Sequence, residues 1–409
     1  VYQHLGGTLQ PAFTAEKRGS KYGPYSTNNG EISGATLQGI IDKALKQTAR
    51  YRSMKEAGAS EAEIKKAFNT PYTMEVFAWV KKNGHYEPGT KTVTMSPRDS
   101  LMYMKSILRT GMIAMDPVTG YVKAYVGGPD FNYFQYDMAS RGKRQIGSTS
   151  KPFLYTLAME QGKDPCSSVS SFASIGGWTP RGSRAGSMTL KQALTSSNNG
   201  VSANLLNELG VPPFIDKLRM FGITSYIESN VTISLGSYDA PVSEMVSAYS
   251  TFANHGIRVN PVYVSRIEDN QGNVIYSANA HRTEVTSSDA CDDMVMMMMN
   301  VVNNGTARAL RSAYNISAEM GGKTGTTNNN SDAWYMGYTP QIVVGVWVGG
   351  EERYIHFNNS SIGQGARSAL PIFGIFMQKL FADRSLPYRQ DIKFEFPEGY
   401  MPCDGAWGD

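Results

Sequence analysis

The sequence predicts an α+β fold in which one antiparallel sheet is built from both ends of a domain, with a helical subdomain inserted between them. Strand patterns occur near residues 111–126 and return at 321–349. Residues 150–310 lie between them and carry mostly helical patterns broken by Gly and Pro loops. A small mixed linker region precedes this domain. Such a plan brings residues near 148 and 323 together although they lie far apart along the chain.

The length and composition are those of an ordinary globular protein. The chain has 409 residues, 41% hydrophobic and 18% charged, which is enough for two or three domains with a sizeable core. The net charge is only +4 and no run of Lys or Arg is present, so no nucleic-acid partner is predicted. We predict a linker or pedestal region at 1–95, the main domain at 96–385 and a C-terminal extension at 386–409.

Cysteine and histidine usage gives no indication of a metal site. Cys166, Cys291 and Cys403 are odd in number and far apart, and they lack CxxC spacing, which argues against a disulfide scaffold and against structural zinc. The five histidines are scattered without an HExxH pair. We therefore expect no metal and no cofactor.

No stretch of the chain approaches the roughly 20 apolar residues that span a bilayer. The longest apolar run, "IVVGVWV" at 342–348, has the length of a strand. The chain starts at Val1 without a signal peptide, and we expect a mature or partial chain whose membrane anchor, if the parent protein has one, has been removed.

The first 95 residues read as small elements. Residues 36–58 show the periodicity of one helix, whose apolar face is formed by Leu37, Ile40, Ile41 and Leu45. Ser60 and Glu63 have capping-box spacing for a second helix, which Pro71 should end. The strands "MEVFAWV" and "KTVTM" flank a tight turn at Asn83-Gly84 and predict a hairpin.

Sharper patterns follow. "LMYMKSILRTG" predicts a helix, and "GMIAMD", the turn "DPVTG" and "YVKAYVGG" predict a hairpin. "GGKTGTT", "DAWYMGY" and "QIVVGVWVGG" predict strands, and "LPIFGIFMQKLFADR" predicts the closing helix. The run "MVMMMMNVV" at 294–302 is interpreted as a pliable core helix that fills gaps, without chemistry of its own.

Two serines stand three residues before a lysine in "SRGKRQIGSTSKPF" at 140–153. Ser140 precedes Lys143 in a segment that is a poor helix start, whereas Ser148 precedes Lys151 at the start of a run of good helix formers. Pro152 suits a first helical turn. On a helix, Lys151 would project from the same face as Ser148, and the helix dipole would favour negative charge on the serine oxygen. Ser148 is the better candidate nucleophile, although a serine in such a place can also be only a cap.

Two more motifs follow Ser148 in the chain. "TSSNNG" at 195–200 contains Ser197-Asn198-Asn199 as Ser-x-Asn; a shifted reading at Ser196-Ser197-Asn198 is open, and a decoy exists at 277–279. "GGKTGTT" at 321–327 places Lys323, Thr324 and Gly325 on a predicted strand, where the glycine would admit a ligand close to the backbone. The order SxxK, SxN, KTG, on helix, loop and strand, is the fingerprint of penicillin-recognising serine enzymes.

With these motifs the chain resembles the transpeptidase domain of a bacterial class A penicillin-binding protein. "GMIAMDPVTGYVKAYVGG", "SLGSYDAPVSEMVSAYSTFANHG", "NNGTARAL" and "GGKTGTTNNNSDAWYMGYTPQIVVGVWVG" are similar to that family, and the resemblance covers roughly residues 96–375. It implies the β-lactamase/transpeptidase-like version of the α+β fold. Ser150 and Ile146 depart from the family, which often has an aromatic residue and a proline there. The glycosyltransferase domain that such proteins normally carry is expected to be absent from this chain.

The resemblance implies a serine-type D,D-transpeptidase that cross-links peptidoglycan stem peptides. Ser148 would attack the carbonyl between two D-alanines, with Lys151 as its base, and Ser197 would relay a proton to the leaving D-alanine. Asn199 would hold the substrate amide and orient Lys151. Three residues of the last motif complete the predicted site. Lys323 and Thr324 would bind the terminal carboxylate, Gly325 would lie beside it, and the backbone N–H groups of Ser148 and Thr326 would form the oxyanion hole.

A neutral Lys151 is needed for this role, since a free lysine has a pKa near 10.4. Burial and a second ammonium at Lys323 would lower that pKa. The implied partners are stem peptides, β-lactam antibiotics and cell-envelope synthesis proteins. The implied location is the extracytoplasmic (periplasmic) face of the bacterial cytoplasmic membrane, with a membrane-anchored parent protein.

Two alternatives stay open. A serine β-lactamase shares the fold and the motifs but deacylates quickly; class A enzymes use a Glu-x-x-Leu-Asn loop, and no such pentapeptide occurs here. A non-catalytic β-lactam sensor or scaffold is the second alternative, although residues 1–95 do not resemble a signalling helix bundle.

Overall fold

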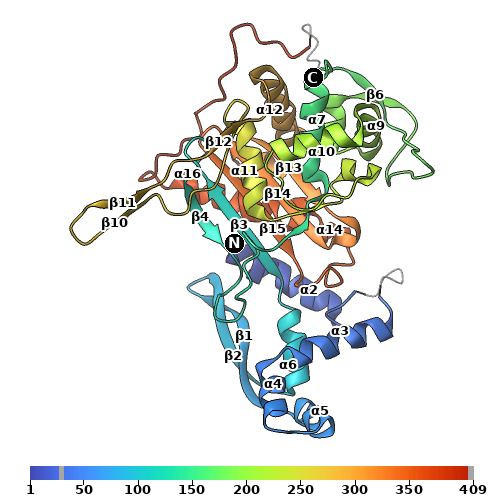
Figure 1. The fold of residues 1–409 in the computed structure, drawn as a ribbon, viewed down its shortest axis with the longest axis vertical. Coiled ribbons are helices and arrows are strands. Elements are labelled where there is room, and N and C mark those ends of the chain that lie inside the picture. The colour runs from blue at the N-terminus through green and yellow to red at the C-terminus, as the bar shows by residue number, and fades with distance from the viewer. Residues whose placement is uncertain (27–31, 404–409) are drawn as a thin grey trace.

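The computed structural model describes residues 1–26 and 32–403, and its centre is a five-stranded antiparallel sheet (Figure 1). The strand order is β13-β14-β15-β3-β4. The bounds are β3 Arg109–Met115, β4 Val122–Val126, β13 Gly321–Thr326, β14 Asp332–Thr339 and β15 Ile342–Gly349. Two strands therefore come from before the helical insertion and three from after it, which confirms the predicted α+β plan.

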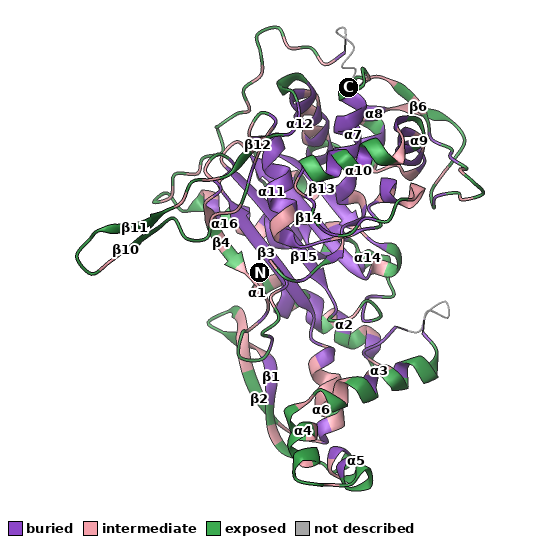
Figure 2. Ribbon diagram, in the orientation of Figure 1, coloured by how far each residue is buried: buried purple, intermediate pink, exposed green. Residues whose placement is uncertain are grey.

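Helices cover both faces of this sheet. Every residue of β3, β14 and β15 is buried, and the sheet forms the purple centre of Figure 2. A Cβ on Gly345 would meet Val246 of helix α11, Val242–Ala253, whereas a Cβ on Gly337 would meet Phe373 of helix α16, Leu370–Ala382. Gly345 is paired with Met336, the neighbour of Gly337, so the two glycines point to opposite faces. The sheet is thus a middle layer, buried on both sides.

The inserted segment is mostly helical, as predicted. Its helices are α7 Lys151–Glu160, α8 Leu190–Ser196, α9 Asn199–Leu209, α10 Val211–Met220, α11, α12 Ser288–Asn303 and α13 Ala309–Ser312. Its short strands are β5 Arg144–Gln145, β6 Ser168–Ser170, β7 Ser187–Thr189, β8 Asp239–Ala240, β9 Ile257–Val259 and β12 Arg282–Glu284. Helix α12 carries the methionine run, and the side chains of Met294, Met297 and Met298 are fully buried in the main core. The interpretation of that run as a core helix is confirmed.

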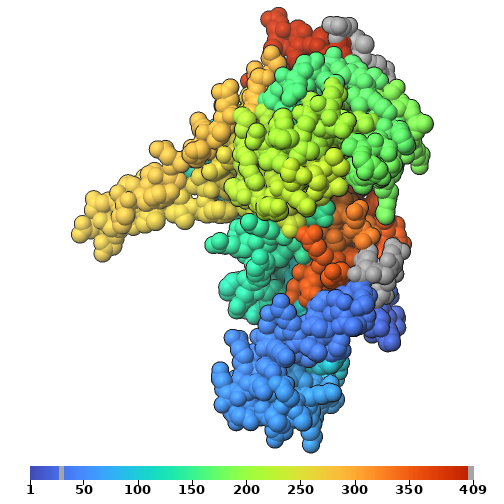
Figure 3. Space-filling model, turned by 45° about the vertical axis from the view of Figure 1, so that its right-hand side comes forward, coloured from blue at the N-terminus to red at the C-terminus, as the bar shows by residue number. Residues whose placement is uncertain are grey.

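A hairpin of β10, Arg266–Glu268, and β11, Val274–Ser277, projects from the body (Figures 1 and 3). All seven of its strand residues are exposed. The decoy Ser-x-Asn at 277–279 begins at the end of this hairpin.

The N-terminal region runs from the centre of Figure 1, where the chain begins, to its lower end. Its elements are α1 Tyr2–His4, the π-helix Leu5–Leu9, α2 Gln10–Lys17, α3 Gly34–Lys46, α4 Ala49–Glu56, α5 Glu61–Asn69, β1 Tyr72–Lys82, β2 His85–Met95 and α6 Pro97–Lys105. The Ser60–Glu63 capping box and the β1–β2 hairpin with Asn83 and Gly84 at positive φ are confirmed. The single helix predicted at 36–58 is wrong. It breaks at Gln47, because the Thr48 side chain accepts a hydrogen bond from Tyr51 N and starts a new helix.

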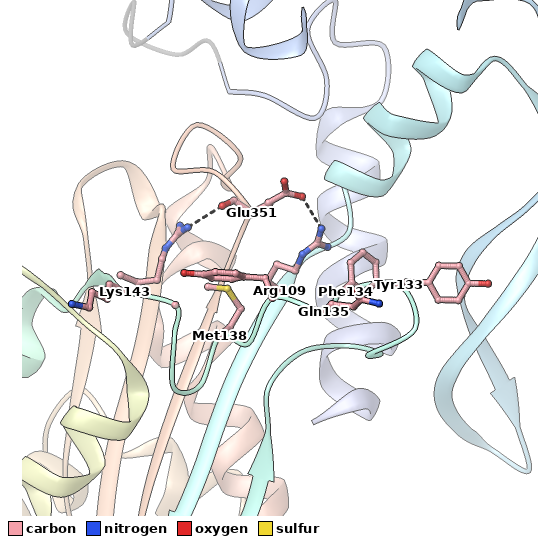
Figure 4. A pocket seen from close by; sticks show the side chains of 10 residues that line it. Arg109, Tyr133, Phe134, Gln135, Met138, Lys143 and Glu351 are labelled. Carbon is pink, nitrogen blue, oxygen red and sulfur yellow. Dashed lines mark hydrogen bonds and ion pairs between the residues drawn. The ribbon is translucent and has the colours of Figure 1, made fainter. Parts of the chain in front are cut away.

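Two buried cations, Lys105 and Arg109, join this region to the sheet through partly exposed carboxylates. Lys105 Nζ lies 2.9 Å from Glu351 Oε1 and 2.6 Å from Glu352 Oε1, and Arg109 Nη2 lies 2.8 Å from Glu351 Oε2. Figure 4 shows the Arg109–Glu351 pair at the edge of a pocket beside Lys143. Burial would raise the pKa of Glu351, but Lys105 and Arg109 outweigh it and the pKa is lowered. The pair therefore stabilises the junction at neutral pH and loses that contribution as acid protonates Glu351.

The C-terminal segment after α16 crosses the surface as an extended strap, residues 386–403. Leu386, Tyr388, Phe394 and Phe396 pack against the main core, and Tyr400 donates a hydrogen bond to Asp293 of α12. A disulfide joins Cys403 to Cys166, with the two Cα atoms 5.9 Å apart. The expectation that the cysteines form no disulfide framework is thus wrong for this pair, because folding brings together positions that are 237 residues apart.

Within the described ranges, no helix has both the length and the apolar character needed to cross a bilayer.

Candidate active site

Ser148 lies in a 3₁₀ turn, η3 Gly147–Ser150, that leads directly into α7. Gly147 has φ +56°, and a Cβ there would lie 3.0 Å from Thr326 O of β13. A Cβ on Gly236 would meet Gly147 O at 2.0 Å, so the turn is held between β13 and the 236 loop. The Ser148 side chain does not cap a helix, and within the described ranges its hydroxyl forms no hydrogen bond. Ser148 is half-buried and lines a groove.

Lys151 is fully buried behind Ser148 and points to the SxN segment. Its Nζ donates to Asn199 Oδ1 at 2.7 Å, to Ser197 O at 2.7 Å and to Ser197 Oγ at 3.2 Å. Burial lowers the pKa of Lys151 well below the usual value, and the neighbouring charge of Lys323 lowers it further. An uncharged amine, able to accept a proton, is therefore favoured at this position.

Ser197 is held between the two lysines. It ends α8 in the left-handed conformation, φ 58° and ψ 43°, and Asn198 then caps α9 by accepting from Val201 N. Its Oγ accepts hydrogen bonds from Lys151 at 3.2 Å and from Lys323 at 2.9 Å. A non-glycine residue in this conformation costs about 1–3 kcal/mol, which is typical of functional sites.

The shifted Ser-x-Asn reading is not supported by the geometry. The hydroxyl of Ser196 turns back to donate to Gln192 O of its own helix, and the side chain is exposed. Asn199, by contrast, accepts from Lys151 through Oδ1 and donates to Arg181 O at 2.8 Å through Nδ2. The side chains that accept from the lysine are therefore those of Ser197 and Asn199, whereas Asn198 accepts only through its backbone O at 3.3 Å.

Strand β13 forms the opposite wall. Lys323 is fully buried; its Nζ donates to Ser197 Oγ and, at 3.1 Å, to Thr324 O, and burial lowers its pKa to about 7. Thr324 Oγ1 lies 2.8 Å from Thr306 Oγ1, and Thr326 Oγ1 accepts from Gly365 N at 3.0 Å. Thr324 and Thr326 line the groove, whereas Lys323 lies behind Ser197.

The lack of a side chain at Gly325 makes room for the nucleophile turn. A Cβ there would lie 2.8 Å from Ile146 O and from Thr149 Cγ2. The expected place of a ligand beside Gly325 stays a prediction. Ile146 is fully buried, and the Ser150 hydroxyl pairs with Tyr238 OH at 2.7 Å, so neither departure from the family pattern lines the groove.

The groove has a volume of about 530 Å³ and runs between these walls. Besides the residues above, it is lined by the turn Thr327–Asn330 and by Asn358, Ser360, Gln364 and Ala366. Sequence reasoning missed Thr306, Arg181, this turn and the four residues between 358 and 366. Thr306 and the turn lie in the segments quoted above for their resemblance, but no short chemical motif singles them out.

A buried ion pair holds the turn in place. Asp332 Oδ1 accepts from Arg144 Nε at 2.6 Å and from Trp347 Nε1 at 3.0 Å. Asp332 Oδ2 accepts from Ser331 Oγ at 3.0 Å and from Thr327 Oγ1 at 3.2 Å. Both charged side chains are buried, so the pair links β5, which precedes the nucleophile, to the groove wall.

We expect Asp332→Ala to lower the free energy of unfolding by about 3–5 kcal/mol, because it leaves the Arg144 charge buried without its partner. Urea denaturation measures the loss. The matched control is Asp239→Ala, which removes a half-exposed partner of Arg353 and should cost less than about 1 kcal/mol. Equal losses in the two variants would contradict the structural role of Asp332.

Comparison with known proteins shows which families and which relatives this chain is similar to. Family models described as "Penicillin binding protein transpeptidase domain" and "Penicillin-binding protein middle domain" match residues 110–370 and 21–108. Penicillin-binding protein 1A of Neisseria meningitidis is 32% identical over 318 residues, covering 74% of this chain and 39% of the relative. Penicillin-binding protein 1A of Rickettsia conorii is 29% identical over 315 residues, covering 68% and 39%. The chain thus spans about two fifths of the length of these curated relatives.

Solved structures share the fold. The structure of penicillin-binding protein 1A from Haemophilus influenzae matches with a TM-score of 0.64 at 19% identity, covering 90% of this chain and 65% of the other. The penicillin-binding protein PonA1 from Mycobacterium tuberculosis matches with a TM-score of 0.60 at 25% identity, covering 71% and 80%. PonA1 in complex with penicillin V matches at 21% identity with the same TM-score, covering 88% of this chain and 95% of that one.

Proposed function

Because the chain belongs to the penicillin-binding protein family, with a transpeptidase domain at residues 110–370, we propose that it is a serine-type D,D-transpeptidase that cross-links peptidoglycan stem peptides. The observation that carries the proposal is the convergence of three distant segments on one hydroxyl. Ser197 Oγ lies within hydrogen-bond distance of both Lys151 and Lys323, and Ser148 lines the same groove as Ser197 and Thr324.

Acylation begins at Ser148. Its Oγ attacks the carbonyl carbon of the D-Ala–D-Ala bond, and its proton passes to the uncharged Nζ of Lys151. The backbone N–H groups of Ser148 and Thr326 stabilise the oxyanion, a contribution typically worth about 10²- to 10³-fold per donor. As the C–N bond breaks, Ser197 Oγ relays the proton from Lys151 to the nitrogen of the departing D-alanine. The product is an ester on Ser148.

Deacylation reverses the proton path. The amine of a neighbouring stem peptide attacks the ester carbonyl and loses its proton through Ser197 to Lys151. The new amide bond is the cross-link, and Ser148 regains its hydroxyl proton. A β-lactam would enter by the same attack, and its ring nitrogen would stay attached to the acyl-enzyme, which explains why such a compound would inhibit.

Substrate binding is assigned to the two walls. Asn199 orients Lys151 and offers the second proton of Nδ2 to the substrate amide. The Thr324 and Thr326 hydroxyls bind the terminal carboxylate beside Gly325, and the charge of Lys323, which lies behind Ser197 Oγ, favours that carboxylate. The expected location is the extracytoplasmic face of the cytoplasmic membrane, where stem peptides and cell-envelope synthesis proteins are the partners.

The test is intact-mass spectrometry after exposure to a fluorescent penicillin, with the modified peptide mapped. We expect one adduct, on the peptide that contains Ser148. Release of the adduct over minutes or longer supports a transpeptidase, and release within a second supports a β-lactamase. Liberation of D-alanine from a stem-peptide donor then separates an enzyme from a sensor; acylation without D-alanine release would overturn the proposed activity.

We expect a bell-shaped pH profile of kcat/KM for donors that end in a free D-alanine carboxylate. On the acid side the rate falls as Lys151 gains a proton and can no longer act as a base. On the alkaline side Lys323, whose pKa is about 7, loses the charge that favours the carboxylate. Stopped assays of D-alanine release check this. A donor ending in D-alaninamide should lack the alkaline fall, and a fall of equal size would exclude Lys323 as its cause.

A further inference from the structure

One cation stands out in the groove. Among the described lining residues, the charged side chain is that of Arg181, and the rest are hydroxyl, amide or methyl side chains. Arg181 is exposed, and its guanidinium forms no ion pair or hydrogen bond within the described part of the chain. No carboxylate of those residues lines the groove to neutralise it. The groove is therefore complementary to an anion.

The backbone that carries this guanidinium is fixed. Arg181 O accepts from Asn199 Nδ2 at 2.8 Å, and Ser183 N donates to Pro180 O at 3.1 Å. A Cβ on Gly200 would meet Ser171 O at 2.0 Å and Ser183 Oγ at 2.9 Å, so the start of α9 packs directly on this loop. Arg181 thus carries a long cationic side chain, and its backbone is hydrogen-bonded to Asn199, which orients Lys151.

The position of Arg181 indicates which end of a substrate it meets. Thr324 and Thr326, which are proposed to take the terminal carboxylate, belong to β13. Arg181 lies on the opposite wall. Lys151 donates to the Asn199 side chain, and that side chain in turn donates to Arg181 O. If the amide that Asn199 holds is the one on the acyl side of the scissile bond, then Arg181 would meet the part of the peptide that precedes D-Ala–D-Ala.

We propose that Arg181 binds a second carboxylate, carried by the side chain of the stem-peptide residue that precedes D-Ala–D-Ala. A guanidinium matches a carboxylate with two parallel N–H···O bonds, which an amide cannot accept in the same way. The inference rests on the proposed function and makes it more specific: the donor is a stem peptide with a free acidic group, and a peptide whose group is a carboxamide is a poor donor.

The test compares two donor peptides that differ only in this group, carboxylate or carboxamide. D-alanine release into water is measured for the unchanged protein and for Arg181→Gln, Arg181→Lys and Arg184→Gln. Arg184 is the matched control, because it is exposed on the same loop but does not line the groove. The rate of acylation by benzylpenicillin, which lacks an acidic group on its acyl side, is measured for every variant.

We expect the unchanged protein to prefer the carboxylate donor by roughly tenfold in kcat/KM, a size typical of a charge-assisted hydrogen bond in a partly exposed site. Arg181→Gln should remove the preference by raising KM for that donor, with the carboxamide donor and the penicillin rate changed less than about twofold. Arg181→Lys should retain part of the preference, and Arg184→Gln should retain all of it.

Other outcomes overturn the inference. Equal kcat/KM for the two donors in the unchanged protein does so, as does an equal loss of both donors in Arg181→Gln. Another such outcome is a preference for a carboxylate that is seen only when an acceptor amine resolves the acyl-enzyme. That result would place the recognised acidic group on the acceptor peptide and would overturn its assignment to the donor. If benzylpenicillin does not acylate the unchanged protein, the result would instead count against the proposed function itself.

Discussion

Replacement of Ser148 by alanine is expected to abolish covalent labelling by penicillin and release of D-alanine from stem-peptide donors. Without Oγ the proposed nucleophile is missing, so the acyl-enzyme cannot form on this residue. We expect the signal to fall below about 10⁻³ of that of the unchanged protein, since loss of a nucleophile removes a whole covalent step. Fluorescent gels and intact-mass spectrometry measure it.

The matched control is Ser140→Ala, the other serine that stands three residues before a lysine. Ser140 Oγ donates to Asp137 and does not line the groove. Labelling should be unchanged in this variant. Labelling that persists in Ser148→Ala, or disappears in Ser140→Ala with the fold intact, would refute the assignment of the nucleophile.

Lys151→Met is expected to slow penicillin acylation by about 10³-fold, because the base that takes the serine proton is lost while the volume is nearly kept. The same change should alter how stability depends on pH. The pKa of Lys151 is lowered in the folded protein, so the unfolded chain binds more protons below the ordinary lysine pKa. Stability should therefore rise with pH in the alkaline range, less steeply in Lys151→Met.

Urea denaturation between pH 7 and 10, beside stopped-flow acylation, checks both parts. Lys323, with a pKa of about 7, contributes to the same rise, so some slope should remain in Lys151→Met. Lys143→Met is the control. Lys143 is exposed and lines the pocket of Figure 4, and its replacement should change neither quantity. An unaltered acylation rate in Lys151→Met would exclude Lys151 as the base.

Much of the fold and of the candidate site could be predicted from the sequence, because both depend on local patterns of residues. The strand and helix periods indicated the sheet built from both ends, and the order of the three motifs indicated which segments meet. The structure brings the amines of Lys151 and Lys323 within hydrogen-bond distance of Ser197 Oγ, while the roles of Ser148, Lys151 and Ser197 stay predictions. The division of the chain at residues 95 and 385 stays a prediction.

The remaining features depend on tertiary contacts that no local pattern encodes. The left-handed conformation of Ser197 follows from two helices that end and begin on either side of it. Gly325 is required by the close approach of the nucleophile turn, which lies 175 to 178 residues earlier in the chain. Asp332 and Arg181 are single polar residues whose significance appears only when Arg144 and Asn199 are folded against them.

The strap that ends at Cys403 has a consequence for how the protein matures. Three cysteines allow three pairings, but Cys291 is fully buried in α12 and burial raises the pKa of its thiol to about 12, so it is a poor participant in thiol exchange. Cys166 is synthesised before Cys403, which lies 237 residues further along the chain. Because the bond joins positions 237 residues apart, it closes a covalent loop that contains every helix from α8 to α16, and an oxidising environment is needed to form it.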